Sequence, residues 1–362
     1  MKTNIAVHYR VPMLIVGFIS LIFGMVIGLA HMGLSLPYVQ SAQRSLHAPL
    51  MICGFLGTVI SLERAVAIGE RWAYMAPLIS ATAAVALMIG LHVSVSAILA
   101  TLASFTLCIV SLNIFLRQRE LFTFTLFVAA LCWLIGCIFW QYGFTIAHVT
   151  PWWMGFLIIT IVGERLELSR FMRPTRGSKV LFIIALVLFL AGASFASLHN
   201  QPDYHLLSSS LILMTLWLIR NDIVRHTIQQ NGLTRYIAVA LSCGYVWLIS
   251  AGIIGLSFPQ LLSGSSYDAF SHAIFIGFVF SMIFGHAPII FPAITKIKIA
   301  YHPSFYLPLI LLQLSLLLRL SGDFIYLSNL RISGGLLHAV SIITFILVLA
   351  MRVKINNKNI MK

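Results

Sequence analysis

The stretch SLHAPLMICGFLGTVISLER, residues 45–64, decides the class of this protein. It carries no acidic or basic side chain between His47 and Glu63. The interval between these two residues corresponds to roughly 24 Å of helix at about 1.5 Å per residue, close to the thickness of a bilayer core of about 30 Å. The segment therefore predicts a transmembrane helix with a histidine at one end and an acidic-basic pair at the other.

The rest of the chain has the same character. Of its 362 residues, 60% are hydrophobic and 9% are charged, and the mean hydropathy is +0.99. We expect an all-α membrane protein, a single polytopic domain over residues 1–362. The first apolar run has no small-residue cleavage site and predicts a retained helix. About twelve transmembrane helices are predicted, at residues 12–33, 46–67, 72–92, 94–116, 121–146, 150–169, 179–198, 206–222, 235–257, 267–290, 303–322 and 332–352.

The net charge of +14 follows the predicted topology. If the N-terminus lies inside, all but three of the 23 Lys and Arg fall in the termini or in turns after even-numbered runs; the exceptions are Arg44, Arg319 and Arg331. This distribution predicts cytoplasmic termini and fits a bacterial inner membrane. It makes membrane lipid the expected partner of the basic groups and requires no nucleic acid. The five cysteines lie within apolar runs without a CxxC pair and are interpreted as packing residues.

A faint repeat links every fourth run. In the second and sixth, His47 and His148 each precede a Gly-Phe pair by seven residues and a Glu-Arg pair by sixteen. In the tenth, His272 precedes Gly-Phe by five, and no Glu-Arg pair follows. The pattern predicts three pseudo-repeated four-helix arcs, each with a histidine at its outer rim; coincidence among small apolar residues is the alternative.

Histidines are costly in hydrocarbon and are common ligands of haem and transition metals. His47 and His272 head facing runs at similar predicted depth, so they form a candidate axial pair for haem b. His338 lies within the last run and could ligate a second metal together with His31, His92 or His148, and the sequence leaves that set open. Met51, one turn after His47, could add a thioether to haem or copper, although packing is the simpler interpretation.

The three outer arginines lie near this proposed site. Arg44, Arg319 and Arg331 are candidate partners of haem propionates. For Arg319, an ion pair with Asp323 four residues later is an equal alternative.

Acidic residues also mark the inner ends of the helices. Each has an arginine nearby, which favours surface ion pairs, with a proton entry path as the alternative; these residues are Glu63, Glu70, Glu164 and Glu167.

The helix count, the histidines of the second and tenth runs and the outer arginines resemble subunit I of the haem-copper oxidases. Within that architecture the chain is most similar to the NnrS family, through YRVPMLIVGF at the start, HAPLMICGFLG in the second run and HAIFIGFVFSM in the tenth. These three motifs cover 32 positions. The resemblance implies haem, with copper as a further cofactor, a link to nitric oxide metabolism, and ligand roles for His47 and His272.

Departures from the oxidase pattern limit this inference. The seventh run has no internal histidine, and the tenth lacks a histidine pair one residue apart. An oxygen-reducing binuclear centre is therefore not expected, and nitric oxide turnover by such a centre is in doubt.

Two functions remain open from the sequence. The first is a haem-binding protein in nitric oxide or respiratory redox handling, with an electron donor or a quinol as partner; catalyst, sensor and electron-transfer subunit are all compatible with it. The second is a transporter that moves protons or a small anion through buried His, Arg and Asp side chains. A structural subunit is a third alternative, and the sequence sets no oligomeric state.

Overall fold

The computed structural model describes residues 4–34, 45–172, 174–199 and 203–353. Within these ranges the chain is helical and forms no strand, which confirms the all-α prediction. In chain order the helices are α1 Val7–His31, α2 His47–Pro49, η2 Leu50–Leu56, α3 Gly57–Ile68, η3 Arg71–Tyr74, α4 Met75–Met88, α5 Val93–Arg117, α6 Leu121–Gln141, α7 Ile146–Ser169, η4 Arg170–Met172, α8 Arg176–Leu198, α9 His205–Asn221, α10 Val224–Thr227, α11 Gly232–Ser257, α12 Gly264–His272, η5 Ala273–Phe280, α13 Ser281–Thr295, η6 Pro303–Phe305, α14 Tyr306–Phe324 and α15 Ser328–Met351.

All twelve predicted runs form helices. Within the described part of the chain, ten helices are long and apolar enough to cross a membrane. The second of the predicted runs corresponds to α2, η2 and α3 together, and the tenth to α12, η5 and α13; we call these the second and tenth spans. The two runs outside the ten are α4, with 14 residues, and α9, with 17. At about 1.5 Å per residue, α4 is roughly 21 Å long, shorter than the bilayer core.

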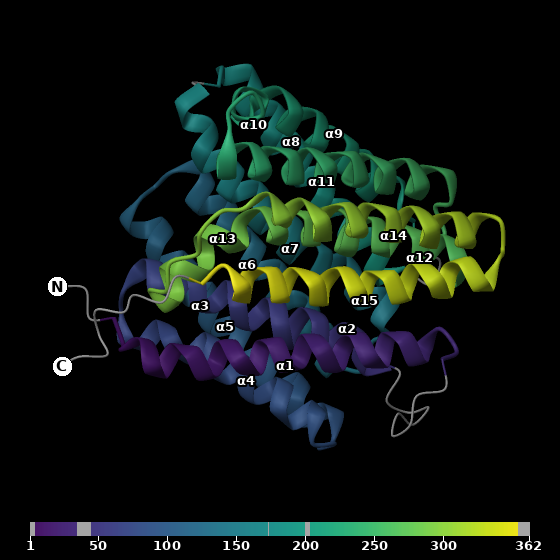
Figure 1. The fold of residues 1–362 in the computed structure, drawn as a ribbon, viewed down its shortest axis with the longest axis horizontal. Helices are drawn as coiled ribbons and strands as arrows, with labels where there is room; N and C mark the ends of the chain where they lie inside the picture. Colours follow the sequence, from purple (N-terminus) through teal and green to yellow (C-terminus); the bar gives the residue numbers. More distant parts are fainter. Residues whose placement is uncertain (1–3, 35–44, 173, 200–202, 354–362) are drawn as a thin grey trace.

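The helices run roughly parallel in one bundle (Figure 1). Helices adjacent in sequence pack side by side, and α1 also contacts α13 and α15 from the other end of the chain. Both ends of the described chain lie at the left in Figure 1. We call this the terminal end of the bundle and the opposite one the distal end.

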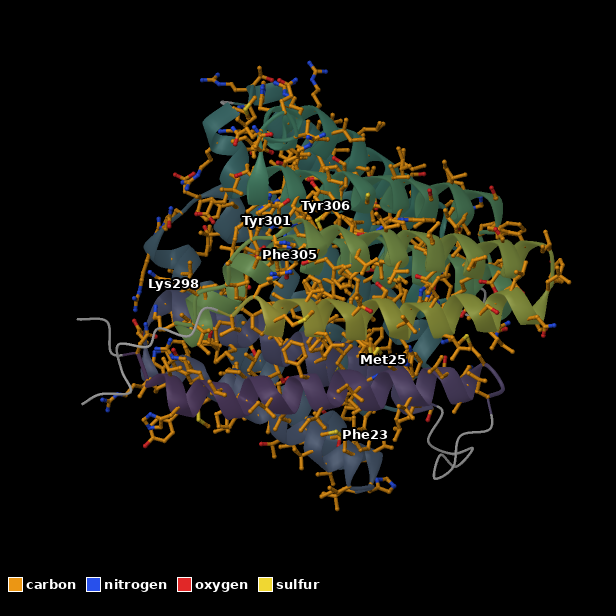
Figure 2. All side chains as sticks on the ribbon, viewed as in Figure 1. Phe23, Met25, Lys298, Tyr301, Phe305 and Tyr306 are labelled. Carbon is orange, nitrogen blue, oxygen red and sulfur yellow. The ribbon has the colours of Figure 1, made fainter. Side chains whose placement is uncertain are left out.

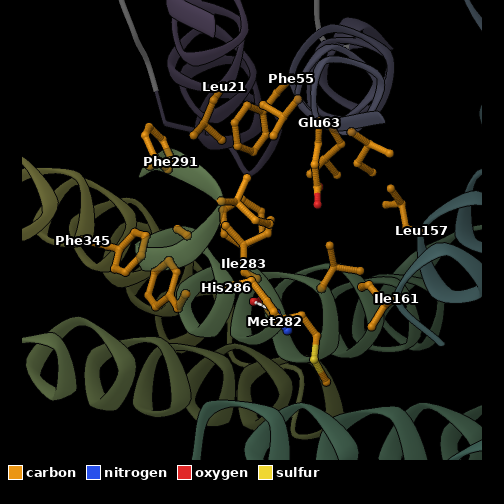
Figure 3. Close-up of a pocket in the computed structure, with 18 of the residues that line it drawn as sticks. Leu21, Phe55, Glu63, Leu157, Ile161, Met282, Ile283, His286, Phe291 and Phe345 are labelled. Carbon is orange, nitrogen blue, oxygen red and sulfur yellow. Dashed lines mark hydrogen bonds between the residues drawn. The ribbon is translucent and has the colours of Figure 1, made fainter. Parts of the chain in front are cut away.

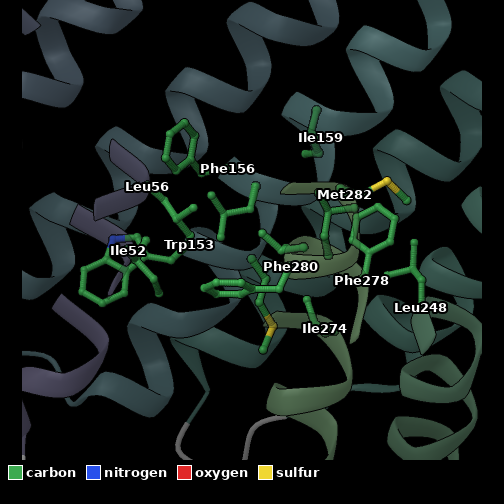
Figure 4. Packing of buried hydrophobic residues seen from close by; sticks show 14 of the residues in the cluster. Ile52, Leu56, Trp153, Phe156, Ile159, Leu248, Ile274, Phe278, Phe280 and Met282 are labelled. Carbon is green, nitrogen blue, oxygen red and sulfur yellow. The ribbon is translucent and has the colours of Figure 1, made fainter. Parts of the chain in front are cut away.

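The second span, α7 and the tenth span converge inside the bundle. Near the distal end the Tyr267 hydroxyl donates to Thr150 Oγ1 at 3.0 Å, which joins the tenth span to α7. Midway, Phe55 of the second span stacks on Phe280 of the tenth, with ring centroids 6.4 Å apart. At the terminal end Arg64 of the second span forms an ion pair with Glu164 of α7. The three segments singled out by the repeat therefore meet, around the aromatic and aliphatic core of Figure 4.

Both histidine-headed spans contain a π-helix. The segment η2 begins three residues after His47, and η5 begins directly after His272. π-helices are rare and occur often at functional sites. Each wide turn adds about one residue and so rotates the two halves of the helix by roughly 100° relative to an unbroken α-helix.

The outer surface of the bundle is apolar. Figure 2 shows Phe23 of α1 directed away from the bundle and Met25 directed into it; their exposed fractions are 45% and 9%. Large exposed apolar side chains recur along α5, α8, α11 and α15. A soluble monomer rarely exposes so much contiguous apolar surface. The protein is a multi-pass membrane protein.

Candidate functional site

Two histidines form a pair in the distal half of the bundle. The rings of His272, from α12, and His338, from α15, have centroids 6.3 Å apart and planes 15° apart. Two imidazoles that bind one metal through nitrogens at about 2.0 Å place their centroids roughly 5 Å apart at a tetrahedral angle and roughly 6 Å apart on opposite sides of the metal. The 6.3 Å separation of this pair is close to the second value.

Hydrogen bonds decide which nitrogen of each ring is available. His272 Nδ1 lies 2.9 Å from the main-chain oxygen of Asp268, which can only accept, so Nδ1 is the donor. Ser315 donates its hydroxyl proton to the Leu312 carbonyl at 2.7 Å and therefore accepts from His338 Nδ1 at 2.5 Å. In both neutral rings the lone pair is then on Nε2.

Metal-binding histidines commonly have the same hydrogen bonds. Nδ1–H donates to an oxygen atom that does not itself bind the metal, and this fixes the ring with Nε2 directed toward the metal. His338 is only 5% exposed, and its Nε2 is buried without a hydrogen-bond partner among the described residues. An unsatisfied buried acceptor has a desolvation cost of about 1–3 kcal/mol. Coordination of a ligand would remove that cost.

His47 belongs to the same region. Its Nδ1 donates to the Gly24 carbonyl of α1 at 2.7 Å, so its lone pair also lies on Nε2. A Cβ at Gly28 would lie 2.7 Å from His47 Nδ1, and only glycine lets the ring approach α1 this closely. His47 lies in the neighbourhood of His272 and Arg319. The ring that stacks on His272 is nevertheless His338, so the structure pairs the tenth span with α15 where the sequence pointed to the second span.

A buried ion pair borders the histidines. Arg319 of α14 donates from Nε and Nη2 to the two carboxylate oxygens of Asp268 at 2.8 and 2.9 Å. The Asp268 carboxylate also lies 3.3 Å from His272 Nδ1. The Arg319 side chain is 8% exposed and that of Asp268 19%. Asp268 thus orients the guanidinium through its carboxylate and the imidazole through its main-chain oxygen.

The alternative pairing of Arg319 with Asp323 is wrong. Asp323 is buried and faces Arg331, with 3.8 Å between Asp323 Oδ1 and Arg331 Nε. A guanidinium group binds a carboxylate most strongly when two parallel N–H groups donate to its two oxygens. Asp268 accepts both of these hydrogen bonds from Arg319. Arg331 remains 33% exposed at the distal end.

The other candidate residues do not join the pair. Met51 packs against α1, where its sulfur lies 2.8 Å from the position a Gly24 Cβ would take. His148 Nδ1 is hydrogen-bonded to Thr145 Oγ1 at the exposed start of α7. Arg44 lies outside the described residues. Throughout the described ranges, no group of three or more His, Cys, Asp or Glu side chains is arranged to hold a metal ion.

Asp268 and Ser315 contribute to the site but were not among the candidate residues predicted from the sequence. Asp268 had a detectable signal, because it is an acidic residue four positions before His272, on the same helical face at the start of an apolar run. Ser315 had none, because a serine within an apolar helix usually returns its hydroxyl to its own backbone. Ser315 does so, and it still accepts from His338.

Comparison with known proteins gives a family but no activity. None of the curated proteins searched matches the chain. A match to a family described as a domain of unknown function extends over residues 10–354, nearly the whole bundle and every side chain of the distal site described above. The chain therefore belongs to this family, Domain of unknown function (DUF8744).

Proposed function

We propose that the protein binds haem through His272 and His338 in the distal half of the membrane and acts in nitric oxide or respiratory redox handling. The observation that carries the proposal is the pair of near-parallel imidazoles whose Nδ1–H groups are fixed by hydrogen bonds, which leaves the lone pair of each neutral ring on Nε2. When bound, a haem iron would supply one-electron redox chemistry and a site for a diatomic gas.

The surrounding residues fit such a group. The His338 Nε2 lacks a partner, and two imidazoles form the axial set of many b-type haems. Arg319 uses two of its five N–H donors on Asp268, and Arg331 is partly exposed, so both can donate to propionates. The resemblance to NnrS proteins supports haem and nitric oxide. The proposal concerns a haem held by two imidazoles; copper, which the resemblance also implies, has no three-residue site in the described ranges.

His47 has a positioning role in this proposal. Its ring lies close enough to His272 and Arg319 for electrostatic coupling, and its Nε2 lone pair can accept a hydrogen bond at the site.

We further propose that the protein lies in a bacterial inner membrane with both termini in the cytoplasm, because its basic residues concentrate at the terminal end. The distal site then lies toward the periplasm.

The test is an absorption spectrum of the purified protein. The full chain, produced in haem-replete cells and extracted in mild detergent, is expected to show a Soret band and about one haem per chain. His272→Ala and His338→Ala should each lose or shift the band, since each removes one axial nitrogen, whereas His47→Ala should retain the haem with a changed spectrum.

The matched control is His205→Ala, because His205 is exposed and paired with Asp203 away from the site. Its spectrum should equal that of the unchanged protein. A colourless protein, or an unchanged Soret band in both His272→Ala and His338→Ala, would refute the proposal.

A second function has one specific observation in its favour. Asp268, Asp323 and Arg319 place two carboxylates and a guanidinium beside the histidines, a set that could bind protons or a small anion for transport. This alternative predicts a colourless protein that moves protons or anions in sealed vesicles, with loss of transport in Asp323→Asn.

A further inference from the structure

A cavity of about 100 Å³ lies in the terminal half of the bundle (Figure 3). Side chains from α1, the second span, α7, the tenth span and α15 line it. Its walls are mainly aromatic and aliphatic, with Phe55, Phe280 and Phe345 among them. The volume is of the same order as the roughly 150 Å³ engineered cavity that holds benzene. The space therefore suits a single six-membered ring.

One wall presents a hydrogen-bond acceptor. His286 Nδ1 donates to the Met282 carbonyl at 2.7 Å, so the lone pair of the neutral ring is on Nε2. His286 Nε2 is buried and has no hydrogen-bond partner among the described residues. The side chain lines the cavity, 14 positions after His272 on the same span and thus roughly 21 Å from the distal pair. A ligand with an O–H group would satisfy this nitrogen.

Glu63 lies on the opposite wall, and Figure 3 shows its carboxylate directed into the cavity. Each of the other three acidic residues at this end forms an ion pair with an arginine, as expected, although the Arg64–Glu164 pair is largely buried and not at the surface. Glu164 pairs with Arg64, Glu70 with Arg117, and Glu167 with Arg170. Because Arg64 is turned to Glu164, Glu63 forms no ion pair or hydrogen bond within the described ranges.

The cavity borders the lipid. Phe18 of α1 and Ile346 of α15 contribute to its wall, and both side chains are half-buried on helices whose outer faces are apolar. Phe18 and Ile346 therefore place one wall of the cavity next to the lipid, beside α1 and α15. The polar groups of a bound molecule would meet His286 and Glu63, and any apolar tail would remain in lipid.

We propose that this cavity binds the head group of a membrane-soluble para-hydroquinone. The apolar walls take the ring, one hydroxyl donates to His286 Nε2 and the other to the Glu63 carboxylate. A ligand with an aromatic body and a donor at each end matches this set of groups. The site is separate from the distal histidine pair, and its occupancy does not depend on haem.

The test measures binding to the full-length protein in lipid nanodiscs. The probe is 2-methyl-1,4-hydroquinone, kept reduced under anaerobic conditions, and the comparison is 2-methyl-1,4-dimethoxybenzene, which has the same ring without O–H donors. Equilibrium dialysis should show saturable binding of one hydroquinone per chain. The dimethoxy compound should bind at least about tenfold more weakly, because it can donate neither of the two hydrogen bonds.

His286→Leu and the near-isosteric Glu63→Gln should each weaken hydroquinone binding by about tenfold. Glu70→Gln is the matched control, because Glu70 is an exposed glutamate at the same end, and it should bind as the unchanged protein does. Equal binding of the two compounds, or the unchanged dissociation constant in Glu63→Gln, would overturn the proposal and would indicate a cavity filled by water or lipid. The Soret band of His286→Leu reports the distal site separately, so the two proposals can fail independently.

Discussion

Single side chains in the distal half depend on neighbours from other helices. Asp268 illustrates this, since it bonds Arg319 through both carboxylate oxygens and lies beside His272 Nδ1. A buried charge that loses its partner costs more than the pair contributes, because the remaining charge cannot regain its water. The stability of this region should therefore respond sharply to the loss of either member alone.

Asp268→Asn should lower the free energy of unfolding by about 3 kcal/mol, because it leaves the Arg319 guanidinium without a counter-charge. The double variant Asp268→Asn/Arg319→Met should recover much of that loss, since it removes both charges. Denaturant unfolding in detergent micelles measures both.

Arg170→Ala is the control for that experiment. Arg170 pairs with Glu167 where both side chains are almost half exposed, so its removal should change stability by no more than about 0.5 kcal/mol. Equal stability of Asp268→Asn and the unchanged protein would contradict the assigned ion pair.

At the level of elements, the π-helices set the direction of the histidines. Because η5 lies between His272 and the rest of its span, the 3.6-residue periodicity does not extend through it. Gly277, within η5, packs against α11: a Cβ there would lie 2.5 Å from Trp247 Cβ. The absence of a side chain at Gly277 therefore lets η5 pack closely against α11.

Gly277→Ala should destabilise the protein by about 1–3 kcal/mol, because the added methyl would overlap the Trp247 side chain near its root. Gly177→Ala, in the first turn of α8, is the matched control. A Cβ at Gly177 meets no described atom within 4 Å, so this change should be neutral or stabilising by up to about 1 kcal/mol. Thermal unfolding of both variants checks the difference, and equal midpoints would contradict the packing of η5 against α11.

Most basic residues and both described chain ends lie at one end of the bundle. Four of the five cysteines are buried and Cys243 is half-buried, so a membrane-impermeant thiol reagent should give little background. This allows the orientation to be tested with single added cysteines at the two ends.

Tyr142→Cys, at the distal turn between α6 and α7, should react in intact cells, since Tyr142 is 79% exposed. Arg176→Cys, at the terminal end of α8, should react only after the membrane is permeabilised, because the basic end is expected in the cytoplasm. The reverse pattern would place the distal histidines on the cytoplasmic side and would contradict the proposed orientation.

Local features of the sequence were enough to predict the helical class, the positions of the helices and the contact between the second and tenth runs. Hydropathy and the spacing of His47 from the Glu63–Arg64 pair are properties of one segment, and a segment of about twenty apolar residues has few alternatives to a membrane helix. His272 and His338 were each predicted as candidate ligands, but His338 was assigned to a second metal together with His31, His92 or His148. Their pairing with each other was not predicted.

Only the tertiary structure decided which side chains meet. His338 rather than His47 stacks on His272, Arg319 binds Asp268 rather than Asp323, and Glu63 faces a cavity while Glu164 takes the arginine. These outcomes depend on how each helix is rotated about its own axis. The two π-helices and the close glycine contacts set that rotation, and neither follows from the periodicity of an ideal helix.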